Sequence, residues 1–326
     1  MTSVCPHGQL SARLCESLEG VRIQPGSRWR ATVRDRTITQ ESAAALRAPL
    51  IRTLYDVLHA GRQEDTSRSR SLRDARLEAQ FAGATPHRNT IAHARVVEAA
   101  RGPLEAIVEL SGVRVSVPSG TIRASQESPR AGATVMVKLP AARPARSPGF
   151  FLADGSLGQP GRSPLLRIYI NIADPDIAPA AWHQALSRLE EKRIRYRAKI
   201  LSTPQSYPRT DSMVIYLGAD AWHLAGELPR MLGSLPGTGS ATSVFARQLA
   251  PGIAMAWEPA DDRLGHTRLS YGQHRSAVLT DALIRHAENQ GTPSLDALVH
   301  EALIEAGVDP LAPERNTDSP ELEFAR

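Results

Sequence analysis

The chain has 326 residues, of which 41% are hydrophobic and 22% charged. These shares are typical of a soluble globular protein, and no apolar run is long enough to cross a bilayer, so the membrane-spanning classes are excluded. A formal net charge of +5 indicates an anionic partner, which by sign alone could be a nucleic acid, an acidic peptide or a phosphate group.

The N-terminus and the cysteines both indicate a cytoplasmic protein. The opening MTSVCPHGQLSARLCESLEG lacks the basic start, the continuous apolar stretch and the cleavage site of a secretory signal. Because Cys5 and Cys15 are the only cysteines, the sequence predicts no disulfide framework and fits a reducing compartment.

Residues 1–104 are predicted to form a mostly helical region. Leucines at helical spacing predict an amphipathic helix that starts near Glu41 and stops at Gly61. Residues 62–78 are rich in Arg and Ser, which indicates a mobile loop or a solvated helix. A short second helix is predicted over residues 85–102.

Residues 105–310 change character and are predicted to form the second domain. The runs EAIVEL, GVRVSVP and ATVMVKLP have a period of two and predict a β-meander. Residues 139–164 are rich in Pro and Gly and are predicted to form a long surface loop that could line a site.

Beyond that loop, LLRIYINI, RYRAKIL and SMVIYLG are predicted strands, interspersed with helices, and residues 311–326 are predicted to be a disordered tail. The predicted fold class is therefore α+β: an N-terminal helical region followed by a mixed, largely antiparallel sheet packed with helices.

Only three of the 39 basic residues are lysines, namely Lys138, Lys192 and Lys199. Arginine stays protonated inside proteins, whereas a desolvated lysine can lose its proton and act as a base. The lysines are therefore the first candidates for proton chemistry. The alternative is that they are ordinary surface charges, which is the expected role of Lys192 at the end of an exposed helix.

Polar side chains gather on two of the predicted strands and at the start of a helix. Because strand side chains alternate, residues 167, 169 and 171 share one face, which leaves Ile168 and Ile170 for the apolar core. The cationic face could line a site, or it could be the solvent-exposed face of a half-buried sheet. These polar residues are Arg167, Tyr169, Asn171, Arg197, Lys199, Arg209, Ser270, Tyr271, His274 and Arg275.

In these segments the chain resembles a known family. LRIYINI, RAKIL, PRTDSMVIYL and LSYGQHRSAVLTD resemble the HopA family of type III effectors, whose domain also occurs as the lyase of class V lanthipeptide and thioamide-peptide biosynthesis. The resemblance covers residues 105–310. More distantly, the same order of segments is similar to the OspF and SpvC phosphothreonine lyases. It implies a lyase that removes phosphate from phosphoserine or phosphothreonine by β-elimination and leaves dehydroalanine or dehydrobutyrine.

The resemblance also implies roles for individual residues. Lys199 matches a family lysine and is the first candidate for the base, with Lys138 as the runner-up. The family's Lys-x-His is replaced by Arg167-x-Tyr169, which leaves His274 and Tyr169 as competing candidates for the acid. The residues expected to bind phosphate and substrate are Arg167, Asn171, Arg197, Arg209, Ser270 and Arg275.

This mechanism needs no metal and no cofactor. It does require a separate kinase, because the chain contains no P-loop and no kinase signature. The implied partners are that kinase, which could form a heterocomplex with the chain, and a phosphorylated precursor peptide with leader and core. Arginines in the N-terminal third offer a docking surface for them.

Two other functions compete with this one. The first is a non-catalytic module that binds phosphopeptides or partner proteins. The second is a nucleic-acid binder, which the low aromatic share of 5% disfavours. We therefore expect neither nucleic acid nor membrane as a partner.

Overall fold

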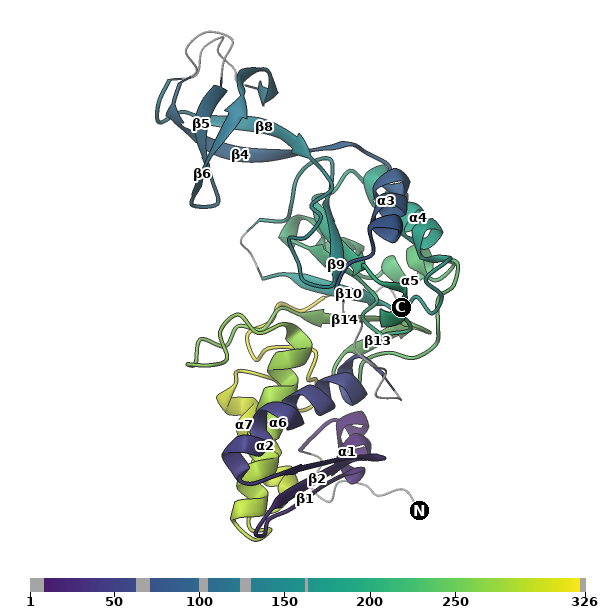
Figure 1. Cartoon of the computed structure of the whole chain (residues 1–326), viewed down its shortest axis with the longest axis vertical. Coiled ribbons are helices and arrows are strands. Elements are labelled where there is room, and N and C mark those ends of the chain that lie inside the picture. Colours follow the sequence, from purple (N-terminus) through teal and green to yellow (C-terminus); the bar gives the residue numbers. More distant parts are fainter. Residues whose placement is uncertain (1–8, 63–70, 100–104, 124–129, 162–163, 323–326) are drawn as a thin grey trace.

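The computed structural model describes residues 9–62, 71–99, 105–123, 130–161 and 164–322. Their strands form three sheets, which follow one another along the long axis of the molecule (Figure 1). A six-stranded sheet lies in the middle, a five-stranded sheet projects at one end, and helices with a three-stranded sheet form the other end. The predicted α+β class is confirmed. None of the described helices combines the length and the apolar character needed to cross a bilayer.

The central sheet is antiparallel, with the strand order β13-β14-β10-β12-β11-β9. Strand β9 lies inside residues 139–164, so the prediction of a continuous surface loop there is wrong. The apolar run FFLA interrupts the Pro- and Gly-rich stretch, and Phe151, Leu152 and Ala153 are buried against the sheet core. The six strands are β9 Phe150–Asp154, β10 Leu166–Ile170, β11 Tyr196–Leu201, β12 Met213–Leu217, β13 Arg247–Ala250 and β14 Ile253–Trp257.

One face of the central sheet is covered by short helices. Ile168 and Ile170 of β10 pack there with Ile200 of β11 and Trp182 of α4 in one apolar cluster. The predicted alternation of β10 and β11 is therefore confirmed, with their aliphatic residues on this face. The helices near this face are α3 Ala75–Ala84, α4 Ala178–Glu191, α5 Leu228–Leu232 and the 3-10 turns Pro204–Ser206 and Ala219–Leu224.

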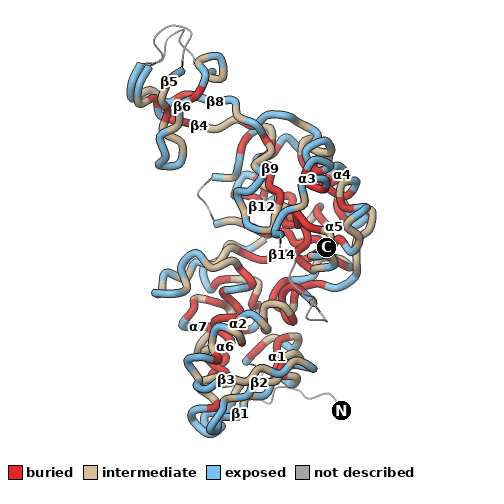
Figure 2. Tube along the Cα trace, in the orientation of Figure 1, coloured by how far each residue is buried: buried red, intermediate tan, exposed pale blue. Residues whose placement is uncertain are grey.

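The opposite face of the sheet is also covered, so it is not the solvent-exposed face of a half-buried sheet. Tyr169 and Val214 belong to a second apolar cluster with residues of the N-terminal and C-terminal helices. Arg167 and Tyr169 are only 6% and 2% exposed. Figure 2 shows buried segments, in red, both in the central sheet around β12 and β14 and along α6. The elements that contribute to this second cluster are α1 Ala12–Glu19, α2 Ala43–Leu54 with a π-helical turn Tyr55–His59, α6 Tyr271–Glu288, α7 Leu295–Glu305, and the sheet of β1 Val21–Gln24, β2 Trp29–Val33 and β3 Arg36–Gln40.

The five-stranded sheet corrects the prediction of a helix over residues 85–102. This segment contains β4, which pairs with β8 from Asn89 to Arg95 and buries Thr90, Ala94 and Val96. Cross-strand pairing of β-branched residues outweighs the helical spacing that the sequence also permits. The strands are β4 Asn89–Glu98, β5 Glu105–Leu110, β6 Val113–Pro118, β7 Ile122–Arg123 and β8 Thr134–Pro140, in the order β6-β5-β4-β8-β7, with a 3-10 turn at Ser119–Thr121.

The ends of the chain and its predicted divisions also differ from expectation. The boundary at residue 104 falls within the five-stranded sheet, and strands β1–β3 stand in the region predicted as mostly helical. Residues 311–322 are not a disordered tail, because Trp257 N–H donates to Glu314 O at 2.8 Å and Asn316 is buried. Cys15 is disulfide-bonded, which the sequence did not predict, while Cys5 lies outside the described residues. Much of the 62–78 stretch, residues 63–70, also lies outside the described residues.

Candidate functional site

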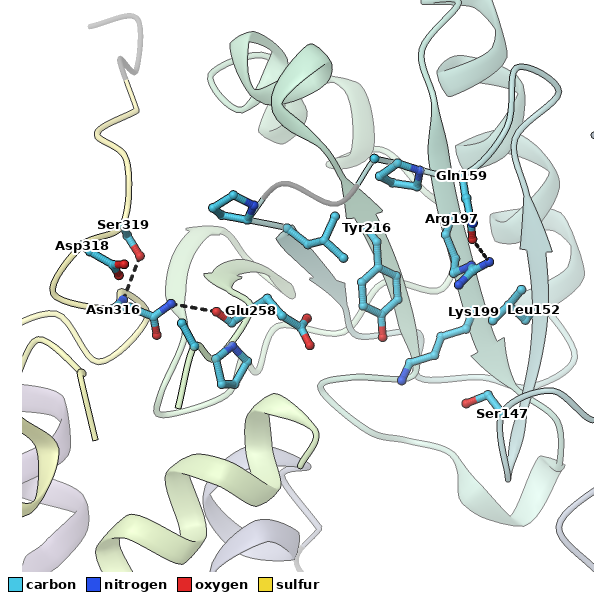
Figure 3. A pocket seen from close by; sticks show the side chains of 16 residues that line it. Ser147, Leu152, Gln159, Arg197, Lys199, Tyr216, Glu258, Asn316, Asp318 and Ser319 are labelled. Atoms are coloured by element: carbon cyan, nitrogen blue, oxygen red, sulfur yellow. Dashed lines mark hydrogen bonds between the residues drawn. The ribbon is translucent and has the colours of Figure 1, made fainter. Parts of the chain in front are cut away.

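A cavity of about 560 Å³ opens beside the central sheet, at the end of β11 and β12. Lys199 of β11 and Tyr216 of β12 point into the same space, and Glu258 reaches toward it from the segment after β14 (Figure 3). The wall is completed by Asn316 and its neighbours in the C-terminal segment. The lining of the cavity thus combines residues from several segments between Ser147 and Ser319.

Aromatic rings hold the Lys199 amine in this cavity. Its Nζ lies 4.3 Å from the centroid of the Phe150 ring and 5.6 Å from that of the Tyr216 ring. Two guanidinium groups share these rings: Arg209 Cζ lies 5.8 Å from the Phe150 centroid and Arg167 Cζ 5.1 Å from the Tyr216 centroid. The structure therefore brings together a lysine and two arginines that the sequence placed on different segments.

Each arginine near the cavity is paired with a carboxylate. Arg209 makes a two-pronged contact with Asp211 at 2.7 and 2.6 Å, and Arg197 donates to Asp154 at 2.7 Å. Arg167 likewise forms a fork with the carboxylate of Glu258, at 2.5 Å from Nη2. Lys199 forms no ion pair with a carboxylate among the described residues. Among the described residues, Lys199 is therefore the one of these cations that no carboxylate holds, whereas the three arginines can offer a ligand the N–H groups that their salt bridges leave unused.

His59 is a buried polar residue that the sequence analysis missed. It ends the π-helical turn after α2, with Nδ1 2.9 Å from Ser243 Oγ and Nε2 3.6 Å from Asp211 Oδ2. Burial lowers the pKa of His59 to about 4, so its ring is neutral at pH 7. The one sign of this packing in the sequence is Gly272 of the motif SYGQHR. A Cβ at this residue would lie 2.1 Å from the His59 ring, so the close contact requires glycine.

Asp211, which directly follows the RT of PRTD, links this histidine to the cation cluster. Burial alone would raise the pKa of Asp211, but the charge and hydrogen bonds of Arg209, together with the charge of Lys199 and the other groups around it, hold that pKa well below its usual range. Asp211 also accepts a hydrogen bond from the Tyr55 hydroxyl at 3.1 Å. The carboxylate therefore stays ionised and fixes the orientation of Arg209.

His274, the first candidate for the acid, lies outside the cavity. Its Nδ1 is 2.8 Å from Arg275 Nη1, and since arginine can only donate, Nδ1 accepts. Nε2 therefore carries the proton and donates to Asp261 Oδ2 at 2.8 Å. Burial, followed by the charge of Arg275, lowers the pKa of His274 to about 4. With both ring nitrogens engaged, His274 serves to connect buried groups.

Arg275 also lies away from the cavity lining, which does not favour its expected role in phosphate binding. It is 1% exposed and donates to Pro313 O at 2.8 Å and to Asn316 Oδ1 at 3.3 Å. Asn316 in turn donates to Glu258 O at 2.7 Å and lines the cavity. Arg275 therefore holds the C-terminal segment in place as a wall of the site.

The remaining predicted residues lie at different distances from the cavity. Tyr169 is buried beneath it, with its ring 5.3 Å from that of His59. Asn171 lines a second cavity of about 400 Å³, together with Arg209, and donates to Ala241 O. Ser270 precedes α6, where its N–H donates to Gln273 Oε1 at 3.0 Å. Lys138 is exposed on β8, in the projecting sheet, so the runner-up base is not part of this site.

A cluster of Asp261, His266 and His274 has possible metal-ligand atoms within 4.8 Å of one another. The donor set does not fit a metal ion. His274 Nε2 carries a proton for the reason given above, and Arg263 donates to both carboxylate oxygens of Asp261. A cation would have to displace these hydrogen bonds, so the cluster is better described as a hydrogen-bonded salt-bridge network.

The sequence and structure were compared with known proteins. A family model described as the HopA1 effector protein family matches residues 141–315, which is more than half of the 326 residues. The chain belongs to this family. The HopA1 match contains β9 to α7, and so all the strands of the central sheet.

Two solved structures are similar to this HopA1-family chain. They are effector proteins from Pseudomonas syringae pv. tomato strain DC3000 and pv. syringae strain 61, with 17% and 16% sequence identity and TM-scores of 0.44 and 0.45. Each alignment covers 84% of this chain, and 98% and 97% of the two effectors respectively. No curated protein matches the chain significantly.

Proposed function

We propose that the chain is a phosphoserine/phosphothreonine lyase acting on a peptide. The observation that supports this most directly is the amine of Lys199 at a cavity, sharing its two aromatic neighbours with the guanidinium groups of Arg167 and Arg209. A lysine can supply the base, and arginines can hold a phosphate group that carries nearly two negative charges.

The reaction would be a β-elimination. Lys199 Nζ takes the proton from Cα, the electrons of that bond form the Cα=Cβ double bond, and the Cβ–O bond breaks. The products are a dehydroalanine or dehydrobutyrine residue and inorganic phosphate. All atoms and electrons come from the phosphopeptide, so no oxidant, reductant or cofactor enters the balance.

The leaving phosphate needs a proton or a cation beside it. The hydroxyl of Tyr216 lines the cavity together with the Lys199 amine, and the two lie against each other, so we assign Tyr216 this position in place of His274. Arg209 is oriented by Asp211 and can present its remaining N–H groups to phosphate oxygens. Tyr169, which is buried below, would act on the site only through the packing of its neighbours.

The substrate must be phosphorylated before it reaches this chain. We propose that a separate kinase acts on a precursor peptide in the cytoplasm and passes the phosphopeptide on. The biosynthesis of a lanthipeptide or a thioamide-containing peptide is the context in which such a pair would operate.

Mass spectrometry of a phosphopeptide after incubation with the purified chain tests this proposal. Loss of phosphoric acid from the peptide is the expected result, and it should disappear in the Lys199→Ala variant. Gain of a free hydroxyl group would mean hydrolysis and would refute the reaction class.

A second candidate is a module that binds phosphopeptides or partner proteins without reacting. It is favoured by the ion pairs that already engage Arg167, Arg197 and Arg209, and by the position of His274 outside the cavity. Binding of the phosphopeptide with no change in its mass would decide for this candidate.

A further inference from the structure

A separate cavity of about 470 Å³ lies where the projecting sheet meets the central sheet. Its floor is apolar, with Ile91 of β4, Leu110 of β5, Val115 of β6 and Leu139 of β8. Val113, at the start of β6, also lines it and is 62% exposed. A large aliphatic side chain left this open beside a cavity is typical of a surface that a ligand covers.

This cavity continues into the candidate site. Gln159 lines both cavities, and its Oε1 accepts a hydrogen bond from Arg197, which lines the first one. Asp154, which binds Arg197, lines the second. We call the two cavities together, joined at Gln159, the peptide groove.

The two sheets that form the groove are fixed against each other. Thr90 Oγ1 donates to Gly155 O at 2.6 Å, and His87 Nε2 lies 2.8 Å from Asp154 O. Gly158 allows the closest approach, because a Cβ at this residue would lie 2.7 Å from Ile91 O and its φ of +105° suits glycine. The two walls of the groove are therefore held in a fixed position relative to each other.

The charge along the outer part of the groove is positive. Asp154, the carboxylate in its lining, is 3% exposed and lies 2.7 Å from Arg197 Nε and 3.5 Å from Arg143 Nε. Arg146, also in the lining, is exposed to solvent. With its carboxylate shared by two guanidinium groups, the groove offers uncompensated positive charge beside an apolar floor.

We propose that the peptide groove binds an extended acidic segment of the substrate peptide that flanks the phosphorylated residue. This inference rests on the proposed function, which places the phosphorylated residue at Lys199. The apolar floor contacts side chains of the segment, and Arg143 and Arg146 attract its carboxylates. The projecting sheet thereby selects the substrate, while the central sheet carries the reacting groups.

Fluorescence anisotropy with the full chain tests the groove without turnover. The probe is a labelled, unphosphorylated peptide with glutamates on both sides of an acceptor serine, and a matched peptide carries glutamines instead. Arg146→Gln should weaken binding of the acidic peptide by about two- to five-fold and leave the neutral peptide unchanged. Arg114→Gln is the matched control, since Arg114 is an exposed arginine on β6 of the projecting sheet and lies outside the groove lining.

The phosphorylated versions of both peptides provide a second readout. Arg146→Gln should raise KM for the acidic phosphopeptide while kcat stays unchanged, because Arg146 lines the outer cavity and is not among the residues that line the cavity of Lys199. Equal affinity for the acidic and neutral peptides, or equal effects of Arg146→Gln and Arg114→Gln, would refute the proposal that the groove binds an acidic segment. Acidic preference that depends on Arg146, observed without any elimination, would support the groove and refute the lyase.

Discussion

Replacing Lys199 separates its possible role as a base from its role as a charge. In Lys199→Met the side chain keeps its length and its contacts with the Phe150 and Tyr216 rings but loses the amine. Loss of the two cation–π contacts costs about 1–2 kcal/mol at a partly exposed position, so the melting temperature should fall by only a few degrees. Loss of a general base should lower kcat by about 10²- to 10⁴-fold.

Lys199→Arg sharpens this prediction, because it keeps the positive charge over the same rings but cannot donate an electron pair to a proton at working pH. We expect phosphopeptide binding to be retained and elimination to be lost in this variant. The assay is the rate of dehydropeptide formation by mass spectrometry, with anisotropy for binding. Lys138→Met, an exposed lysine on β8, is the control and should keep the parent rate. An undiminished elimination rate in Lys199→Arg would refute the assignment of Lys199 as the base.

Three further predictions concern the surroundings of the site. Arg275→Ala leaves Pro313 O and His274 Nδ1 without their donor, so urea titration should show the free energy of unfolding reduced by about 3 kcal/mol; an unchanged unfolding midpoint would contradict this. His59 and His274 have pKa values of about 4 in the folded chain and near 6.5 when unfolded, so between pH 6.5 and 4 only the unfolded state gains protons. The free energy of unfolding should therefore fall as the pH is lowered through this window, by about 1.4 kcal/mol per pH unit for each histidine. In urea titrations at several pH values, His59→Gln should reduce the pH dependence of that free energy by the contribution of one histidine. Arg209→Lys loses the fork that Asp211 orients, so calorimetry should show phosphopeptide affinity reduced by about tenfold, whereas unchanged affinity would place the phosphate elsewhere.

The sequence predicted local features well where one residue pattern dominated. Ile168 and Ile170 alternate with Arg167 and Tyr169, and this period of two is observed in β10 with the aliphatic side chains in one core. The rarity of lysine gave three candidates, and the family resemblance favoured Lys199, which lies in the cavity. The helix after Glu41 is also observed, because its leucines recur at helical spacing.

The predictions that failed concerned segments whose structure depends on contacts with residues distant in the sequence. Residues 85–102 have a composition that suits either a helix or a strand, and pairing with β8 decides for the strand. The FFLA run is too short to stand out within a Pro- and Gly-rich stretch, yet it completes the edge of the central sheet. The C-terminal segment is polar, but Arg275 supplies hydrogen bonds that no local pattern reveals.

In the candidate site, too, some features follow from the sequence and others from the tertiary structure. The sequence by itself determined which residue types were available: a scarce lysine, arginines on alternating strand positions, and the motif SYGQHR. Only the tertiary structure decided that Lys199 meets Arg167 and Arg209 across shared aromatic rings. It also decided that, in that motif, His274 bonds Asp261 and Arg275 bonds the C-terminal segment. The physical reason is that the sequence sets the period of each element, while burial of both sheet faces and the pairing of buried charges determine which elements meet and which side chains reach the cavity.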